Sequence, residues 1–296
     1  MPRPNKITEW AALLFFFALT AFLFHWKIFE NDIFWQIRAG NELLSGQSIQ
    51  TVDQWSTTAP GQPWYNFQSL ACILFAVVHK LGGLTFLPTL RSTLICVSYA
   101  FIYRFIFLWS TQNSKKNHLS IGIAWILLAL SLVITSGRLQ LRPDLLGFVF
   151  FAFLLFVFQR VKPPTLQITL GFMSLVLWVN AHAGTAPIGI LLYCSALLFK
   201  SDLKKLPIEV KSTSLFLGLI SIFITPIHFH ALEMIFAITR KYDWTLIQNP
   251  DHMPLTIELL NPITSGSPFL LWALGAAIGI VSVFKNIKNK NSKMEA

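Results

Sequence analysis

Six polar residues in four short segments have side chains that could do chemistry together. They are two carboxylates, two guanidinium groups, an amide and an imidazole: Asp32, Asp53, Arg138, Arg142, Asn180 and His182. A carboxylate can act as a general base or position a metal ion, and a guanidinium binds phosphate through paired hydrogen bonds. These residues are far apart in the sequence, so the elements between them decide whether the groups meet.

Those elements are strongly apolar. The chain of 296 residues is 54% hydrophobic and 12% charged, with 27 Phe and 10 Trp. Apolar runs recur along its whole length, and a helix needs about 20 apolar residues to cross a bilayer. In lipid every backbone polar group must be paired within its own segment, which favours helices. The composition therefore predicts an all-α, polytopic membrane helix bundle, and its three cysteines lie inside apolar runs as small buried hydrophobes.

The runs predict eight membrane crossings within one transmembrane domain, residues 1–296. The crossings lie at about 7–29, 84–110, 119–136, 145–160, 166–180, 185–199, 213–228 and 268–284. Residues 30–83 form a first outer loop, in which 64–82 is predicted to be an interfacial or re-entrant helix because its apolar run, Leu70–Val78, is too short for a comfortable span. Three further junctions share the outer side: Gly137–Asp144, Asn180–Gly184 and His228–Pro268.

The charge distribution sets the orientation. Of the 23 lysines and arginines, 14 lie at alternate ends of the runs. These 14 residues lie at the N-terminus, in the segments around residues 115, 160 and 205, and in a basic tail at 285–296. This segregation follows the positive-inside rule and predicts both termini in the cytoplasm. The net charge of +10 is therefore interpreted as a signal that sets the orientation of the chain in the membrane. The same distribution argues against nucleic acid as a partner.

The motifs resemble those of a known family when they are taken in order. The first outer loop contains Asp32-Ile-Phe-Trp35, then Asp53-Gln-Trp-Ser56, then Gly61-Gln-Pro-Trp64. Arg142-Pro143 follows at the start of one run, and Trp178-Val-Asn-Ala-His182-Ala-Gly184 ends another. The ordered set resembles bacterial multispanning membrane proteins related to C-class glycosyltransferases, which use polyprenyl-phosphate-linked sugars.

The resemblance implies a protein of the bacterial cytoplasmic (inner) membrane, in the cell envelope, with the C-class membrane scaffold. Its expected substrate is a polyprenyl-phosphate sugar, held with its tail in the lipid and its sugar at the outer face. Asp32 and Asp53 are the catalytic candidates, as base or as ligand of a divalent metal. The four substrate-binding candidates are Arg138, Arg142, Asn180 and His182.

Each candidate also has a structural interpretation. Asp32 can end one helix or cap the next, and Asp53 can be a turn carboxylate. Arg138 and Arg142 can reach lipid head groups, and His182 can be a structural histidine at a helix end. The tryptophans fit an interfacial aromatic belt.

Two departures from the family pattern point to an alternative function. Gln68 stands where a His-Glu-Trp-like stretch would place a carboxylate, and an amide cannot act as a base. The chain is also shorter than full-length enzymes of this class. The alternative is a non-catalytic membrane subunit that keeps the scaffold and binds a protein partner or lipid. A transporter is a third, less favoured class, for which Arg104 is the best intramembrane charge.

Overall fold

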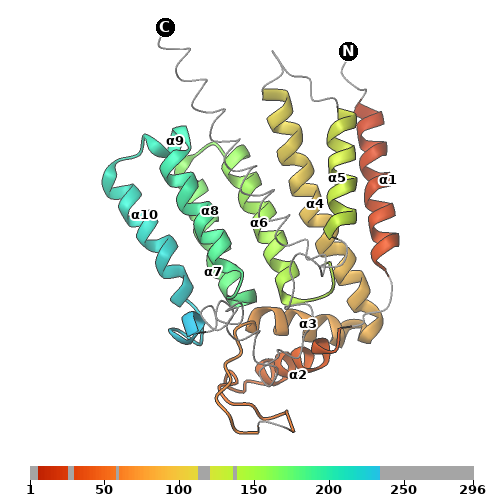
Figure 1. Cartoon of the computed structure of the whole chain (residues 1–296), viewed down its shortest axis with the longest axis vertical. Helices are drawn as coiled ribbons and strands as arrows, with labels where there is room; N and C mark the ends of the chain where they lie inside the picture. The colour runs from red at the N-terminus through yellow and green to blue at the C-terminus, as the bar shows by residue number, and fades with distance from the viewer. Residues whose placement is uncertain (1–5, 26–29, 58–59, 113–120, 136–138, 234–296) are drawn as a thin grey trace, which may run out of the picture.

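The computed structural model describes residues 6–25, 30–57, 60–112, 121–135 and 139–233. Within these residues the chain is helical, and its only β-pairing is an isolated bridge between Val52 and Pro63. The predicted all-α class is therefore confirmed, and the helices form a bundle (Figure 1).

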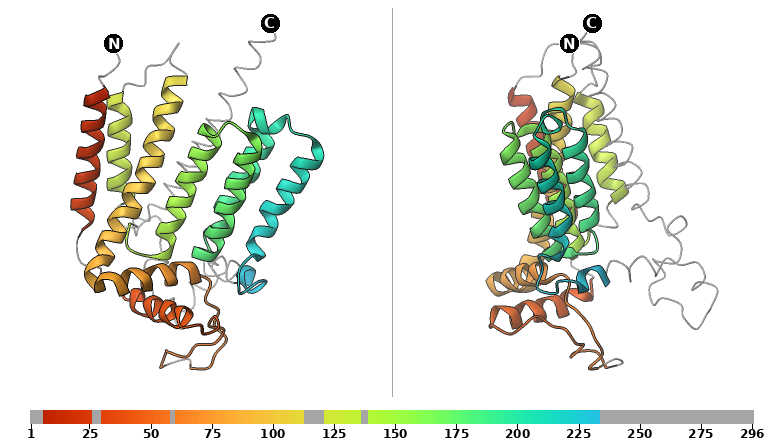
Figure 2. Two further views of the ribbon diagram at one scale, coloured as in Figure 1. Left: turned by 180° about the vertical axis from the view of Figure 1, so that it is seen from behind. Right: turned by 90° about the vertical axis from the view of Figure 1, so that its left-hand side faces the viewer.

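Seven helices lie side by side and give the bundle its length (Figures 1 and 2). They are α1 (Lys6–Phe24), α4 (Phe86–Gln112), α5 (Ile121–Thr135), α6 (Pro143–Arg160), α7 (Pro164–His182), α8 (Ala186–Phe199) and α10 (Ile208–Ile220). Helices α2 (Asp32–Leu44) and α3 (Ser69–Gly82) lie across one end of the bundle, here called the α2–α3 end. The short helix α9 (Ser201–Lys204) marks the opposite, α9 end.

Three helical stretches of the described chain are long and apolar enough to cross a membrane: Ser69–Ile106, Pro143–Arg160 and Pro164–His182. Shorter apolar helices occur at Leu14–Phe24 and Ala186–Phe199. A helix rises about 1.5 Å per residue, so a 14-residue helix reaches about 21 Å and falls short of a hydrocarbon core of about 30 Å. Length and composition thus support a membrane helical bundle and only part of the predicted set of eight crossings.

The first of these stretches bends sharply between α3 and α4. The 3₁₀ turn η1 (Gly83–Thr85) separates the two helices, and Gly83 has a φ of 64°. This left-handed conformation suits a glycine, which has no Cβ. The bend lays α3 across the end of the bundle while α4 runs along it (Figure 1). The predicted interfacial position of residues 64–82 stays a prediction.

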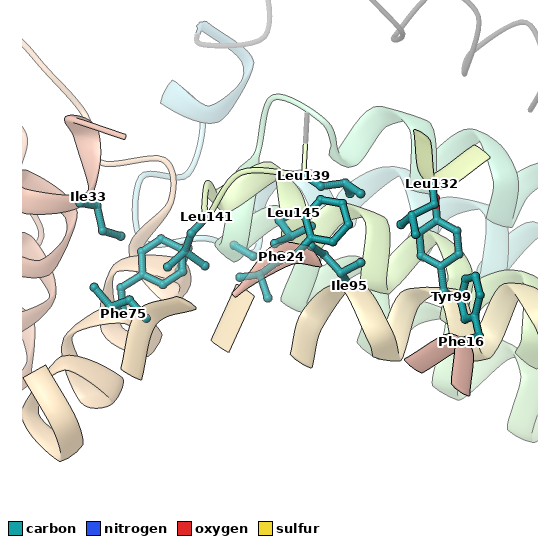
Figure 3. Close-up of a cluster of buried hydrophobic side chains, with 14 of the residues drawn as sticks. Phe16, Phe24, Ile33, Phe75, Ile95, Tyr99, Leu132, Leu139, Leu141 and Leu145 are labelled. Carbon is teal, nitrogen blue, oxygen red and sulfur yellow. The ribbon is translucent and has the colours of Figure 1, made fainter. Parts of the chain in front are cut away.

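Two hydrophobic clusters form the core. The first joins α1, α4 and α5 to α2, α3 and the segment before α6, and Figure 3 shows it extending from Ile33 and Phe75 through Leu141 to Phe16 and Leu132. The second joins α6, α7 and α8 around Trp178 and Tyr193. Helices α4 and α6 pack together, as do α3 and α7, so the two halves are connected at the middle of the bundle and at the α2–α3 end.

Helix positions follow the predicted apolar runs closely, with differences at α1, which ends at Phe24 rather than at residue 29, and at α10. The run predicted at 213–228 corresponds to α10, which begins at Ile208 and ends at Ile220. A 3₁₀ turn, η3 (Ser221–Phe223), follows. Pro226 has no backbone N–H to donate to the preceding turn, so the helix ends upstream of it. The predicted crossing at 268–284 and the basic tail lie outside the described residues.

Candidate functional site

The predicted site residues that the structure describes all lie at the α2–α3 end. Asp32 begins α2, Arg142 precedes α6, and Asn180 and His182 end α7. Asp53 lies in the segment between α2 and α3, which extends beyond α2 (Figure 1). Arg138 lies outside the described residues. The fold therefore gathers segments that are separated by up to 150 positions, as the predicted sidedness of the loops requires.

Asp32 presents an exposed carboxylate. It is the first residue of α2, and its side chain has no hydrogen bond or ion pair with any described residue. The preceding residue, Asn31, makes no side-chain cap either. A carboxylate in the first turn is favoured by the helix dipole, whatever else it does. The position leaves the Asp32 oxygens available to a proton or a cation.

Asp53 has the geometry of a turn carboxylate. Its Oδ1 accepts hydrogen bonds from the backbone N–H groups of Trp55 at 3.0 Å and Ser56 at 2.9 Å. These two hydrogen bonds hold the pKa of Asp53 below its ordinary value, and the bond from Ser56 contributes more than the bond from Trp55. The backbone of Asp53 also pairs with Gln62 and Gly61, which closes the loop. A catalytic role for this residue stays a prediction.

Three tryptophans hold this loop against α2. Trp35 of α2 lies 5.3 Å from Trp64 and 6.3 Å from Trp55, between ring centroids, and Trp55 and Trp64 are 5.9 Å apart. The guanidinium of Arg38 lies over Trp55 at 5.3 Å. The rings thus pack on one another, which gives these residues a local structural role.

Arg142 is paired with a carboxylate that the sequence did not single out. Its Nε donates to Oε2 of Glu30 at 2.6 Å, and the Glu30 side chain is only 12% exposed. Arg142 is the N-cap of α6 in extended conformation, and Pro143 is suited to the first helical position. The pair connects the segment that follows α1 to the start of α6, 112 residues later. The only signal in the sequence for Glu30 was its position two residues before Asp32.

Arg91 is a second residue that the sequence did not reveal. It lies on α4, is fully buried, and donates through Nε and Nη2 to the carbonyl oxygen of Phe24 at the end of α1. Its Nη1 donates to Oε1 of Gln140 at 3.3 Å. A cation near a helix C-terminus satisfies the last carbonyls and interacts favourably with the dipole. Arg91 therefore fixes where α1 ends and where the segment carrying Arg142 lies.

Asn180 connects α7 to the segment after α10. Its Nδ2 donates to the carbonyl oxygens of Val176 at 2.8 Å and Ile224 at 2.7 Å. Both amide hydrogens are thereby used inside the protein. This contact positions the last turn of α7 and leaves only the amide oxygen of Asn180 for a ligand.

The motif Trp178–Gly184 meets the segment between α2 and α3 at His182. The His182 ring packs edge-on against Phe67 with centroids 5.5 Å apart, and the N–H of Ala183 donates to the carbonyl oxygen of Phe67 at 3.3 Å. Asp144 of α6 is within electrostatic range of His182. The motif Trp178–Gly184 is therefore a spatial neighbour of residues that closely follow two other motifs, Gly61–Trp64 and Arg142–Pro143.

Tight packing explains two glycines at this meeting point. A Cβ on Gly147 of α6 would lie 2.9 Å from Nε1 of Trp178 and 3.0 Å from Oγ1 of Thr185. A Cβ on Gly189 of α8 would lie 2.5 Å from the same indole ring. Trp178 is fully buried, so these contacts fix α6, α7 and α8 against one another.

Gln68 joins, through its backbone, a polar network that is buried at Asn66 and exposed at Arg38. Its backbone N–H donates to Oδ1 of Asn66 at 3.2 Å, and Asn66 donates to Gln50 at 3.0 Å. Gln50 in turn donates to Glu42 on α2 at 3.0 Å, and Glu42 accepts from Arg38 at 3.2 Å. The network joins α2 to the start of α3. The Gln68 side chain is 5% exposed, a position where an unpaired carboxylate would be costly.

In the described part of the chain no group of three or more His, Cys, Asp or Glu side chains is arranged to hold a metal ion. The divalent metal that the resemblance implies stays a prediction. Comparisons with protein-family models, with curated proteins and with solved structures give no match for this chain. The family resemblance thus rests on the motifs alone.

Proposed function

We propose that the protein is a multi-pass membrane protein of the bacterial cytoplasmic membrane that transfers a sugar from a polyprenyl-phosphate donor. The reaction would take place at the α2–α3 end, on the outer face. One observation carries the proposal: Asp32 offers an exposed carboxylate without a described partner, at the end of the bundle where the motif segments converge. Glycosyl transfer needs such a base next to the lipid.

The proposed chemistry assigns separate tasks to the groups at this end. Asp32 removes the proton of the acceptor hydroxyl, whose oxygen attacks the anomeric carbon while the bond to the phosphate breaks. The departing phosphate needs a cation, and Arg142 becomes available to it if its pairing with Glu30 is exchanged. The proton remains on Asp32 until water takes it. A donor tail in the lipid would keep the sugar phosphate at this level.

Charge supports the proposed orientation. Exposed basic residues lie at the α9 end, among them Arg160, Lys162, Lys204 and Lys205. The positive-inside rule would place that end in the cytoplasm. Labelling with a membrane-impermeant thiol reagent tests this: Ser201→Cys should react only from the inside and Ser48→Cys from the outside. The three native cysteines supply the background, and the reverse pattern would contradict the orientation.

The activity test compares two carboxylates. In proteoliposomes supplied with polyprenyl-phosphate sugars and hydroxyl acceptors, Asp32→Asn should lower turnover by about 10²–10⁴-fold, the usual loss for a general base. Glu209→Gln is the matched control, because this exposed carboxylate lies in the first turn of α10, at the α9 end of the bundle. Wild-type turnover in Asp32→Asn would show that the base is elsewhere.

A second function is favoured by Gln68. Its buried amide occupies the position where the family pattern expects a carboxylate, which suits a non-catalytic subunit that binds a lipid or a protein partner in a membrane complex. Gln68→Glu separates the two functions. A rise in turnover, or its appearance, would support a transferase scaffold that lacks one acid. Absence of turnover from both proteins over a broad range of donors and acceptors would favour the subunit.

A further inference from the structure

His182 is held by Thr185, three residues later, at the junction of α7 and α8. The backbone N–H of Thr185 points to Nδ1 of His182 at 3.2 Å and to the His182 carbonyl oxygen at 3.3 Å. The Thr185 hydroxyl lies 3.1 Å from the same Nδ1. A backbone N–H can only donate. Its hydrogen therefore occupies the side of the ring where a hydrogen on Nδ1 would have to point.

Trp178 directs the hydroxyl of Thr185. The indole Nε1 donates to Oγ1 of Thr185 at 2.9 Å, and an indole nitrogen is only a donor. The hydroxyl therefore accepts from Trp178 and sends its own hydrogen towards His182, whose Nδ1 is at 3.1 Å and whose carbonyl oxygen is at 3.4 Å. Two donors of Thr185 thus face His182, and the backbone N–H, which can only donate and lies 3.2 Å from Nδ1, favours an Nδ1 that accepts.

The opposite nitrogen of the ring is available. Phe67 packs edge-on against the ring at 5.5 Å and limits its rotation. Nε2 of His182 has no hydrogen-bond partner among the described residues, and His182, the last residue of α7, is partly exposed. An imidazole that accepts at Nδ1 carries its proton on Nε2 when it is neutral.

We infer that His182 is a neutral imidazole protonated at Nε2, and that it donates a hydrogen bond from Nε2 to an oxygen of the lipid-linked sugar phosphate. The ligand part of this inference rests on the proposed function. Thr185 is the positioning residue that selects the tautomer, and Trp178 orients Thr185. His182 is thereby a donor and cannot serve as the base of the reaction, which leaves proton removal to a carboxylate.

The tautomer can be measured without any ligand. Long-range ¹H–¹⁵N spectra of protein labelled at its histidine nitrogens, recorded in nanodiscs at about pH 8, distinguish the two neutral forms above the ordinary pKa of imidazole. The His182 signals are identified by their loss in His182→Gln. We expect a single Nε2–H pattern in the wild type and in Thr185→Ser, and a predominant Nε2–H pattern with some Nδ1–H in Thr185→Val, which loses the hydroxyl but keeps the backbone N–H donor. A wild-type Nδ1–H pattern would overturn the inference.

Two isosteric variants test the donor role. A glutamine amide nitrogen reaches the place of Nε2 and donates, whereas an asparagine places its oxygen near Nδ1 and has no group at Nε2. Binding of polyprenyl phosphate, of polyprenyl-phosphate sugar and of inorganic phosphate is measured for both in nanodiscs. Relative to the wild type, His182→Asn should weaken lipid-ligand binding about tenfold or more, and His182→Gln should restore most of it.

Comparing the ligands identifies the oxygen to which Nε2 of His182 donates. Equal losses for lipid phosphate with and without sugar indicate a phosphate oxygen, and a loss confined to the glycosylated lipid indicates a sugar oxygen. Both results support the donor role. Equal binding by the two variants would overturn it, provided that both melt at the same temperature. Failure of the wild type to bind any polyprenyl phosphate would contradict both the proposed function and the donor role of His182. The tautomer of His182 is tested separately, by the spectra.

Discussion

The two ends of the bundle use their polar side chains differently. At the α9 end Gln167, Lys200 and Asp202 satisfy one another: Lys200 donates to Gln167 at 3.0 Å and to Asp202 at 2.6 Å, and Gln167 donates to Asp202 at 2.8 Å. Burial raises the pKa of Asp202, but the hydrogen bonds from Lys200 and Gln167 outweigh it and bring the pKa below its ordinary value. This cluster is closed and fastens α7 to the α8–α9 turn.

The α2–α3 end is fastened over longer distances and is not closed. Arg91 reaches a carbonyl 67 residues away and Arg142 a carboxylate 112 residues away. After these contacts are made, the Asp32 carboxylate and Nε2 of His182 still have no described partner. One end therefore holds neighbouring helices together, whereas the other holds distant segments together and presents two polar groups without a described partner.

Replacing Arg91 should have the largest effect on stability. In Arg91→Met the Phe24 carbonyl and the Gln140 amide lose their donor, and each unsatisfied buried group costs about 1–3 kcal/mol. We expect the free energy of unfolding in detergent micelles to fall by about 2–4 kcal/mol. The matched control is Arg104→Met, an exposed arginine on the same helix. Equal losses in the two variants would show that the Arg91 contacts do not fasten this end.

A methyl group on Gly40 should be the next most damaging change. A Cβ there would lie 2.0 Å from the carbonyl oxygen of Cys72 and 2.7 Å from Cβ of Ala76, so α2 and α3 would have to separate. Overpacking of this kind costs about 1–3 kcal/mol. Gly40→Ala should lower the melting temperature and expose the α2–α3 end to proteolysis.

Leu44→Ala is the control for Gly40→Ala because Leu44 is exposed at the end of the same helix. Its effect on the free energy of unfolding should stay within about 0.5 kcal/mol. A Gly40→Ala protein with wild-type stability would mean that α2 and α3 are further apart than described.

Much of the fold followed from the sequence because apolar runs mark helices that pack by burial. The runs at 145–160 and 166–180 lie within α6 and α7, and the short run at Leu70–Val78 lies within α3. The predicted start of α10, at residue 213, was wrong because residues 208–212 are mixed in polarity and form no continuous apolar run.

The site was predictable in part. Asp32 and His182 could be chosen from local motifs, and the turn geometry of Asp53 followed from the serine three positions later. Arg91 could not be found, because it is hidden in an apolar run and its main partner is a backbone carbonyl, which every residue has. The pairing of Glu30 with Arg142 needed the tertiary structure. The spacing of His182 and Thr185 at a helix end was a local signal that sequence reasoning missed.

Opening the closed cluster at the α9 end should reduce stability without affecting the proposed site. Gln167→Leu leaves Lys200 and Asp202 with one partner fewer, and a hydrogen bond to a charged group contributes about 1.5–3 kcal/mol. Because Lys200 and Asp202 are partly exposed, we expect a loss of about 1 kcal/mol. Polyprenyl phosphate binding should be unchanged. A tenfold loss of binding would contradict the division of roles between the ends.

The smallest effect is expected on the loop at Asp53. Its pKa is lowered in the folded protein, so its contribution to stability is present above the unfolded pKa and disappears as the pH falls through the folded value. Hydrogen exchange at the Trp55 and Ser56 amides should therefore become less protected, relative to the rest of the chain, below about pH 4. In Asp53→Asn this pH dependence should vanish. A wild-type loop whose protection rises as the pH falls would contradict the turn geometry.

The central claim is that the α2–α3 end is the functional end. It is tested most directly by photo-crosslinking a polyprenyl phosphate that carries a photoreactive group beside the phosphate to the protein in nanodiscs. We predict that the crosslinked peptides map to the segments around Asp32, Arg142 and His182, and that excess unlabelled polyprenyl phosphate competes for them. Competable crosslinks confined to the α9 end, around Lys200 and Lys205, would contradict the account.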